Sequence, residues 1–451
     1  MIQTIHKTVA VWIKSIFMEF LGLSRTMMIY CLLVIGLFLL LATFWFFHSA
    51  PPGTIIMASG PPGSIFYSNA EKYAKILLRH GVTLKVLPSA GSADNLKQLS
   101  DASHHVDIGF IQSGTSDGKR YDNLISLGSV SYQPVLIFYR NKTSIDLLSD
   151  LKGKSIAVGP EGSGTHKLAL TLLAANGIEQ GSSTTLLTID SDIAVKYLVD
   201  NKIDAVFLMG DSASLQNIRT LLLAPGIYLF DMTQADGYTR RISYLSKLIL
   251  PKGAVDFGNN IPDHDVHLVT PTVELVARDD LHPALLDLFI EAAQEVHGGA
   301  GLFRNKAEFP SPVSFDFIIS DDAIRYYKSG KTFLYRYLPF RLANLANRFL
   351  VVFVPIILLL IPGIRVIPAV YRLRVNLNIY KWYRVLLALE REVMIPIDPS
   401  KQSELLQSID RIERDVDAMK VTAPFAEEFY VLRGNINFVR TKILNSIRLS
   451  A

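Results

Sequence analysis

The chain has a single cysteine among its 451 residues, and it lacks sequence patterns that mark two common kinds of enzyme site. Cys31 lies inside a long uncharged run, so the remainder of the chain can form no disulfide and no thiolate metal site. The zinc-protease motif HExxH is absent, and the glycine-rich segment 159–165 lacks the lysine of a phosphate-binding P-loop. We therefore expect no enzymatic activity, no metal and no cofactor. A region without disulfides is compatible with a bacterial periplasm.

Charge is also scarce, and its distribution along the chain is uneven. Only 19% of the residues are charged, and the net charge is +4. Residues 1–26 carry a net charge of +2 and residues 365–451 a net charge of +4, whereas residues 48–348 carry −2. Because basic segments stay on the cytoplasmic side of a bacterial inner membrane, this pattern predicts cytoplasmic termini and a periplasmic middle region. We see no basic patch that would indicate a nucleic-acid partner.

Two uncharged runs predict membrane-spanning helices. The first, at residues 27–47, has 21 uncharged residues, which is enough to cross the hydrocarbon layer as one helix. A cleaved signal peptide is the alternative, but the flank at residues 48–51 (HSAP) is a poor cleavage site, which favours a retained anchor after a cytoplasmic segment at 1–26. The second run, Phe349–Ile364, reaches spanning length only with its neighbours, so we expect a second span at residues 345–369.

The region between the two runs alternates short apolar strands with amphipathic helices. This pattern is typical of βαβ units and of α/β domains with mainly parallel sheets. Its length is large for one sheet, so we expect a two-lobe α/β domain at residues 50–335. The first crossing between the lobes is expected near Tyr139–Lys142 and the return near Arg240–Lys247. Residues 54–140 and 245–335 are therefore assigned to lobe 1, and residues 141–244 to lobe 2.

Four turns that follow predicted strands are rich in glycine and small polar residues. In parallel α/β sheets, ligands bind beyond the carboxyl ends of the strands, and a helix that begins there offers free N–H groups to an anion. The four turns are Gly60–Ser64, Ser89–Asn95, Ile111–Gly114 and Gly159–Thr165. Each turn alone is equally compatible with ordinary helix capping. Together they predict a cleft between the lobes for a small anionic solute that carries a carboxylate group.

Five segments in this order resemble the solute receptors of the TRAP transporters, in the branch called the TAXI family. They are GSIFY (Gly63–Tyr67), SAGSADNL (Ser89–Leu96), DIGFIQSG (Asp107–Gly114), LKGKSIAVGPEGSGT (Leu151–Thr165) and HLVTPTVELVARDDL (His267–Leu281). The resemblance implies the type II periplasmic binding-protein fold, in which two lobes close on a solute. It also implies a carboxylate- or amino-acid-like ligand and TRAP-type permease subunits as partners. The retained anchor and Pro61-Pro62 in the first turn depart from the family pattern.

The motif positions, together with the glycines of the turns, supply the candidate ligand-binding residues. These are Gly60, Gly63, Ser64, Tyr67, Gly91, Ser92, Asn95, Gln112, Ser163, Gly164 and Thr165. Ser92 is expected to cap its helix, with Asn95 one turn inside it. The leading hypothesis is a membrane-tethered solute-binding protein that presents its solute to a permease.

Residues 370–451 are predicted to form a cytoplasmic helical tail. Apolar residues recur at intervals of three and four, namely Leu405, Ile409, Ile412, Val416 and Met419, and then Phe425, Phe429, Leu432, Ile436, Val439 and Ile443. This seam indicates a helical hairpin or a coiled-coil dimer, with a self-contained bundle as the alternative. A tail of this kind could bind a cytoplasmic partner or a second copy of itself. The competing hypothesis is therefore a transmembrane sensor that signals through the coiled coil.

Overall fold

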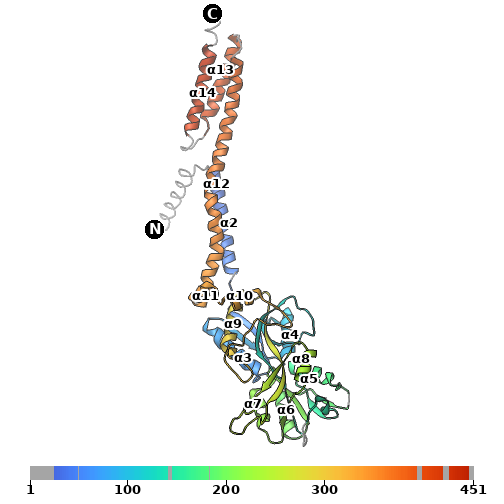
Figure 1. The fold of residues 1–451 in the computed structure, drawn as a ribbon. Coiled ribbons are helices and arrows are strands. Elements are labelled where there is room, and N and C mark those ends of the chain that lie inside the picture. The colour runs from blue at the N-terminus through green and yellow to red at the C-terminus, as the bar shows by residue number, and fades with distance from the viewer. Residues whose placement is uncertain are drawn as a thin grey trace. The chain divides into compact units, whose positions relative to one another are not determined.

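The computed structural model describes residues 25–48, 50–140, 145–181, 183–393, 399–419 and 426–445. The chain divides into two compact units (Figure 1). One unit is Ala50–Asn347, and the other combines Met1–Ser49 with Arg348–Ala451. Each unit is described separately below.

The Ala50–Asn347 unit is a mixed α/β structure with two sheets. Strands β1 (Thr54–Ala58), β2 (Thr83–Leu87), β3 (Ile108–Gln112), β4 (Leu124–Tyr132), β10 (Leu245–Leu250), β11 (Val266–Arg278) and β12 (Ile318–Ile319) form a seven-stranded sheet. Strands β5 (Leu136–Tyr139), β6 (Ser155–Ala157), β7 (Thr185–Leu187), β8 (Ala205–Leu208) and β9 (Tyr228–Leu229) form a five-stranded sheet. The helices are α3 (Ile65–Arg79), α4 (Ser92–Ser100), α5 (Gly164–Ala175), α6 (Ser191–Val199), α7 (Leu215–Leu223), α8 (Ala235–Arg241), α9 (Pro283–His297), α10 (Asp321–Ser329) and α11 (Phe333–Tyr337).

Both sheets mix parallel and antiparallel pairs, which corrects the expectation of mainly parallel sheets. Strand β1 is parallel to β2 and β3, whereas β11 is antiparallel to β3, β4 and β10. In the five-stranded sheet, β6 is parallel to β7 and β8, whereas β5 is antiparallel to β8 and β9. The antiparallel pairs involve β5 and β11, which are the strands next to the points where the chain changes lobes.

The first crossing between the lobes lies at residues 133–135, which corrects the expected position near Tyr139–Lys142. Strand β4 belongs to the seven-stranded sheet and β5 already belongs to the five-stranded sheet. Residues 141–144 of the expected crossing lie outside the described residues. The amides of Gln133 and Val135 donate to the carbonyl oxygens of Pro271 and Val269, at 3.0 and 3.1 Å. The crossing segment is therefore hydrogen-bonded along its length to β11.

Sheet membership changes back between β9 and β10, which includes the expected return near Arg240–Lys247, whereas the change from one hydrophobic core to the other comes later, along β11. Leu245 and Leu250 of β10 are buried in the hydrophobic clusters of the second lobe, and Leu268 of β11 is buried there too. Further along β11, Leu275 lies in the core of the first lobe. One long strand thus starts in lobe 2 and ends in lobe 1, next to the outward crossing.

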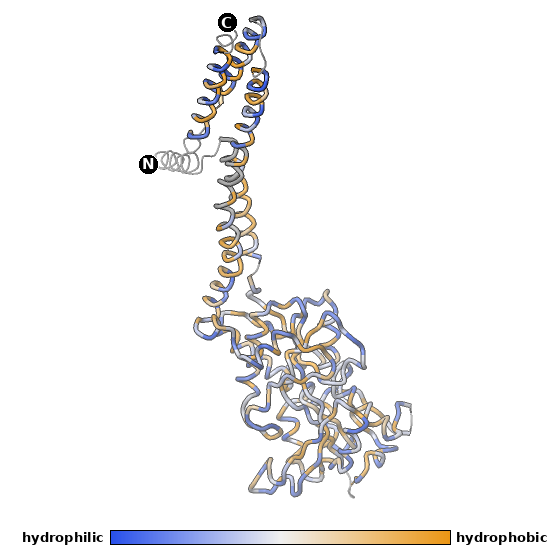
Figure 2. The backbone as a smooth tube through the Cα atoms, turned by 45° about the horizontal axis from the view of Figure 1, so that its top comes forward, coloured by the Kyte–Doolittle hydropathy of each residue, from blue (hydrophilic) through white to orange (hydrophobic). Residues whose placement is uncertain are grey.

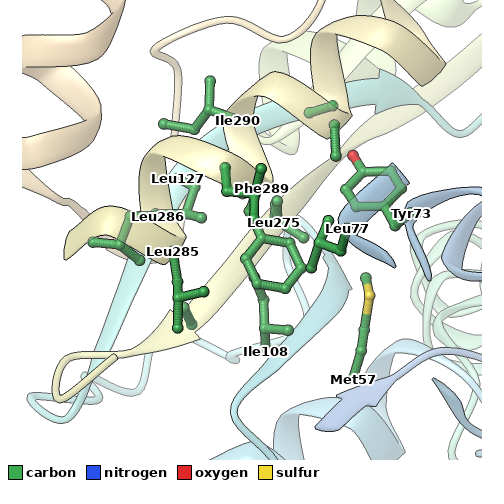
Figure 3. Close-up of a cluster of buried hydrophobic side chains, with 14 of the residues drawn as sticks. Met57, Tyr73, Leu77, Ile108, Leu127, Leu275, Leu285, Leu286, Phe289 and Ile290 are labelled. Atoms are coloured by element: carbon green, nitrogen blue, oxygen red, sulfur yellow. The ribbon is translucent and has the colours of Figure 1, made fainter. Parts of the chain in front are cut away.

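Helices cover both faces of the seven-stranded sheet. On one face, α3 and α9 bury residues such as Tyr73, Leu77 and Phe289 against Met57 and Ile108 (Figure 3). Apolar residues of α3 recur at helical spacing, so that one side of the helix is buried. On the other face, α4 packs against the side chains of β1 and β3 that alternate with the first set. The same alternation in lobe 2 places α5 on one face of its sheet and α6 with α7 on the other.

The second unit contains α2 (Arg25–His48), the larger part of α12 (Phe340–Val393), α13 (Pro399–Asp417) and α14 (Ala426–Asn445). Among the described residues, one helical stretch, Phe340–Leu358, is long and apolar enough to cross a membrane, and the apolar stretch Gly36–His48 of α2 is shorter. The stretch in α12 begins before the expected span at 345–369. The expected arrangement with two spans stays a prediction.

The tail helices form a three-helix bundle with the end of α12. Leu405, Ile409, Ile412 and Val416 of α13 and Leu432, Ile436, Val439 and Ile443 of α14 are buried together with Ile379 and Leu386 of α12. Hydrophobic and hydrophilic residues alternate along α13 and α14, as the predicted seam requires (Figure 2). Of the remaining seam positions, Met419 is half-buried outside this cluster, Phe429 is partly buried against it, and Phe425 lies outside the described residues. In a single chain, the seam is thus used within a self-contained bundle.

Candidate functional site

The first predicted turn holds the start of α3 against the second lobe. The amides of Ile65 and Phe66 donate to the carbonyl oxygens of Ala213 and Gly210, at 3.2 and 3.1 Å. Both acceptors follow β8 of the five-stranded sheet. N–H groups of a helix terminus have no partner within the helix, and here the other lobe supplies the partners. The amides that we expected to face an anion are therefore occupied in this structure.

The other candidates of the first turn take different positions. Ser64 caps α3, with its Oγ accepting a hydrogen bond from Tyr67 N at 3.1 Å. A Cβ on Gly60 would lie 2.5 Å from the carbonyl oxygen of Asp211, so only glycine allows this contact between the lobes. Gly63 is exposed with a φ of +86° and open space around it, and Tyr67 is half-buried.

In the second turn, the N-cap of α4 is Gly91 and not Ser92, which corrects the expected capping role of Ser92. The Ser92 hydroxyl oxygen instead accepts a hydrogen bond from Gln112 N at 3.1 Å. The N–H of Ser92 donates to the carboxylate of Asp211. Gly91 has a φ of +134°, and a Cβ there would lie 2.7 Å from Asp211 Oδ2. Both residues therefore lie against a side chain of lobe 2.

Asn95 links the second turn to two strands. Its Nδ2 donates to the carbonyl oxygens of Ser59 and Phe110, at 2.6 and 2.9 Å, and its Oδ1 accepts from Ser89 Oγ at 2.6 Å. The side chain is fully buried. Asn95 thus uses both of its N–H groups on the main chain, and in this structure its role is to hold β1, β3 and the turn together.

The third turn contributes a polar atom without a partner. Gln112 is buried, and its Oε1 has no hydrogen-bond partner in the described part of the structure. A Cβ on Gly164 would lie 2.5 Å from this oxygen. Gln112 of lobe 1 and Gly164 of lobe 2 therefore meet at the centre of the closed cleft.

The fourth turn begins α5. Ser163 is its N-cap, with Oγ accepting from His166 N at 3.0 Å and donating to Pro160 O at 2.6 Å. The first two residues of the helix, Gly164 and Thr165, are buried and face a carboxylate. A short polar turn that ends in a helix N-terminus is what the sequence predicted at this position.

That carboxylate belongs to Asp211, the residue around which the predicted turns are arranged. Its Oδ2 accepts from Gly164 N at 2.5 Å and from Thr165 N at 3.3 Å, and its Oδ1 accepts from Thr165 Oγ1 at 2.5 Å. Ser92 N of the first lobe is a further donor. Two of the predicted turns thus contribute to one site, because Gly91 and Ser92 of the second turn and Gly164 and Thr165 of the fourth all lie against Asp211.

Asp211 is fully buried, and burial raises the pKa of its carboxyl group. The hydrogen bonds from Thr165, Gly164 and Ser92 act in the opposite direction, because they stabilise the ionised form. The site thus presents converging neutral donors to a carboxylate. This is the chemistry that binds and orients an acid group.

The sequence analysis did not single out Asp211. It follows strand β8 (Ala205–Leu208), in the segment Met209-Gly210-Asp211-Ser212. The rule that ligands bind beyond strand ends applies to this strand as well, so it offered a signal. The helix that follows this segment, α7, begins only at Leu215.

Two further contacts close the lobes beside this site. Asp94 N of lobe 1 donates to Gly162 O of lobe 2 at 2.8 Å. Lys167 of α5 reaches back to lobe 1, where its Nζ lies 2.5 Å from Asp117 Oδ2 and also donates to Thr115 O. The structure is therefore a closed form in which the lobes are joined by hydrogen bonds of the chain itself.

Other groups with possible chemistry lie apart from this site. His264 pairs with Asp263 and His267 with Asp231, and no group of three or more His, Cys, Asp or Glu side chains among the described residues could hold a metal ion. Residues 114–118 (GTSDG) fit the string G-x-S-x-G of a nucleophile elbow. Ser116 there is buried, its Oγ accepts from Gly118 N at 3.3 Å, and no helix follows, unlike in a nucleophile elbow.

Comparison with known proteins links the chain to one family. The model of the NMT1-like family matches residues 57–293. Among solved structures, an ancestral arginine-binding protein bound to arginine is similar at 16% identity, with 55% of this chain and 93% of that chain covered and a TM-score of 0.35. The periplasmic aliphatic sulphonate binding protein SsuA from Escherichia coli has 15% identity, coverages of 54% and 69%, and a TM-score of 0.33.

PhnD1 from Prochlorococcus marinus (MIT 9301), in complex with methylphosphonate, has 13% identity, coverages of 54% and 84%, and a TM-score of 0.35. The proteins in these structures bind small solutes, as their names and bound ligands state. At such identities and TM-scores, the likeness does not extend to the ligand of this chain.

Proposed function

The chain belongs to the NMT1-like family, and we propose that it is a membrane-tethered solute-binding protein that captures a small anionic solute between its two lobes. The observation that carries the proposal is the arrangement of donors around Asp211. Ser92 N, Gly164 N and the N–H and hydroxyl of Thr165 converge on a carboxylate from both lobes. Hydrogen bonds to an ionised acceptor are about twice as strong as neutral ones, so these donors suit a solute carboxylate.

In the closed form, hydrogen bonds between the lobes occupy the groups that a bound solute would use. When the lobes separate, the amides of Ile65, Phe66, Ser92 and Asp94 lose their acceptors in lobe 2. They belong to the first turns of α3 and α4, where unpaired amides favour an anion. A solute carboxylate would bind to these amides in the open form and take the place that Asp211 and the neighbouring carbonyl groups hold in the closed form.

An amino-acid-like solute fits this scheme better than a simple carboxylic acid. Its carboxylate would bind the freed amides of lobe 1, while its ammonium group would pair with the displaced carboxylate of Asp211. A buried carboxylate is stabilised by a cation at short range, and the donors to Asp211 named above are all neutral. Closure on a zwitterion then adds no net charge to the cleft, whereas a simple carboxylic acid would place a second negative charge beside Asp211.

For the biological role we propose TRAP-type transport, with permease subunits in the membrane as partners. The resemblance of five ordered segments to TAXI receptors supports this role. The apolar stretch Phe340–Leu358, which begins within the 50–347 unit and ends beyond it, would tether that unit to the membrane, with the unit in the periplasm.

A sensor is the alternative, and the continuity of α12 favours it. Phe340 at the start of this helix packs against the core of lobe 1, and Leu386 near its end is buried in the three-helix bundle. One helix therefore carries residues of both cores. In this alternative, opening and closing of the lobes would change the bundle, which would act on a cytoplasmic partner or on a second copy of the tail.

The test begins with the solute. The full-length chain, purified under native conditions, should release a small acid or amino acid that mass spectrometry identifies, and that compound should bind again in calorimetry. Transport and sensing are then separated by deletion of residues 396–451. Loss of solute uptake only when residues 48–348 are removed supports transport, whereas loss of a cellular response with uptake intact on removing the tail supports sensing. A chain that neither carries nor binds any acid contradicts both.

A further inference from the structure

A cavity of about 490 Å³ lies between the lobes beside the carboxylate site. Ile65 and Gly210, which join the lobes at the first turn, are in its wall, but neither Asp211 nor any of the eleven predicted ligand-binding residues lines it. Its volume is within the range of about 300–1,000 Å³ that is usual for small-molecule sites. The cavity is thus large enough for a ligand of its own.

The wall of the cavity is mostly apolar. Ile218 and Leu222 of α7, Leu250 of β10 and Phe303 of the segment after α9 contribute to it. Leu215 of the same wall is 69% exposed. A ligand with an apolar body would remove this surface from water, at about 25 cal/mol per Å² of apolar area.

The charged groups of the wall have one sign. Arg219 from lobe 2 and Arg304 from lobe 1 line the cavity, and no Asp or Glu does so. Asp256, on which Arg219 acts electrostatically, lies outside the wall. Guanidinium groups bind carboxylate and related acid groups through paired hydrogen bonds. The electrostatic preference of the cavity is therefore for an anion.

A buried polar atom of the wall also lacks a partner. His297 at the end of α9 is 2% exposed, and its Nε2 has no hydrogen-bond partner in the part of the chain that the structure describes. Burial, assisted by the charges of Arg304 and Lys72, lowers the pKa of His297 to about 3, so its imidazole is neutral at physiological pH. A neutral imidazole can donate one hydrogen bond to an acid group without bringing a charge of its own.

We propose that this cavity is a second binding site, and that its ligand is a small amphiphilic acid. The apolar body would lie against α7 and Phe303, and the acid group would face Arg219, Arg304 and His297. A cation is disfavoured by two guanidinium groups, and a sugar-like ligand would leave polar groups unpaired against the apolar wall. Asp211 and the eleven predicted ligand-binding residues do not line the cavity, although Ile65 and Gly210 lie in its wall.

Calorimetry on the full-length chain in lipid nanodiscs tests the proposal, with empty nanodiscs as the blank. Hexanoate, hexylammonium and hexanol have the same body and differ in the head group. We expect hexanoate to bind at least tenfold more tightly than either of the others. Arg219→Gln and Arg304→Gln should each weaken hexanoate binding at least fivefold, and Leu215→Asp should weaken it as well.

Arg120→Gln is the matched control, because Arg120 is an arginine of lobe 1 that pairs with Asp122 and does not line the cavity. This variant should bind hexanoate with unchanged affinity. Arg219 is exposed, so its replacement tests the head-group contact without a change in the core. Equal affinities for hexanoate and hexylammonium, or unchanged hexanoate affinity in both cavity variants, would overturn the proposal, as would the absence of heat at millimolar hexanoate.

Discussion

The hydroxyl of Thr165 donates to Asp211 Oδ1 across 2.5 Å, and both residues are completely buried. The same hydroxyl also lies 2.9 Å from Ser212 Oγ. A carboxylate removed from water is costly unless hydrogen bonds or opposite charges compensate for the loss of hydration. Here the compensating groups named in the structure are neutral donors at the start of α5 and α4. We therefore expect the Thr165–Asp211 hydrogen bond to contribute both to the stability of the closed cleft and to its proposed preference for a carboxylate.

Replacing Thr165 by Val should destabilise the closed cleft. The change removes one hydrogen bond to a charged group and leaves the shape nearly the same, so we expect a loss of about 1.5–3 kcal/mol. Hydrogen exchange at the amides of α5 and α4, measured by mass spectrometry on the full-length chain, reports this loss. Thr165→Ser keeps the hydroxyl and should retain most of the protection. Equal exchange in the Val and Ser variants would contradict the assigned role of the hydroxyl.

The stability of the 50–347 unit should depend on pH through Asp211. Burial raises the folded-state pKa of this carboxyl group above that of the unfolded chain, which is about 3.9. Between the two pKa values the folded state binds more protons, so the free energy of unfolding should fall as pH rises through this window, and then stay constant. Calorimetric unfolding of the wild type and Asp211→Asn should differ by an amount that changes with pH above about 4. A difference that is independent of pH would show that Asp211 titrates alike in both states.

Replacing Asn95 should lower the stability of lobe 1 more than it affects solute binding. Its amide joins Ser59, Phe110 and Ser89 within lobe 1, and truncation would leave buried carbonyl groups unpaired. Asn95→Ala should therefore cost about 2–4 kcal/mol, from the loss of several buried hydrogen bonds. Calorimetric unfolding measures this cost. Ser68→Ala, at an exposed position of α3, is the control and should be nearly neutral; a similarly small effect of Asn95→Ala would mean that its contacts are dispensable.

The tail bundle should unfold on its own when its core is disrupted. Ile409 of α13 is fully buried in the cluster that this helix forms with α14 and the end of α12. Ile409→Asp therefore places an unpaired charge in the core of the bundle. Of the two tryptophans within the described residues, Trp45 and Trp382, the second packs against this bundle. We expect a red-shifted tryptophan emission with calorimetric unfolding of the 50–347 unit unchanged. Arg411→Gln, at an exposed site of α13, is the control and should change neither signal. If Ile409→Asp also abolished the unfolding transition of the 50–347 unit, the tail bundle and that unit would not unfold independently.

The sequence predicted the positions of the polar turns well, because each follows an apolar strand and carries its own local signal. Gly159–Thr165 is an example, since glycines, a capping serine and a helix start lie within seven residues of one another. The apolar seam of the tail was also predictable from local sequence, since the spacing of apolar residues alone indicates that Ile409 and Ile436 lie on buried faces. Such features depend on neighbours in the chain and not on the tertiary structure.

The partners of those turns could not be predicted in the same way. That Ile65 N and Phe66 N meet carbonyl groups of lobe 2 depends on how the two sheets face each other. Residues 135–139 form an apolar run that would fit either sheet, so the first crossing was placed too late. The site residues as a set stay a prediction. What the structure adds is that Ser92, Gly164 and Thr165 share Asp211 as their partner, and that Asn95 faces the main chain.

The most direct test of the carboxylate site around Asp211 uses variants that lack this carboxylate. Small acids that replace the missing atoms should restore the stability of these variants. Asp211→Gly lacks the equivalent of acetate, and Asp211→Ala lacks the equivalent of formate. Calorimetric unfolding of the full-length chain should show that acetate raises the Tm of the Gly variant more than formate does, that formate is the better ligand for the Ala variant, and that neither acid affects the wild type at equal ionic strength. If no acid stabilises either folded variant beyond the matched chloride control, the junction is not a carboxylate site and the proposed mode of solute capture is wrong.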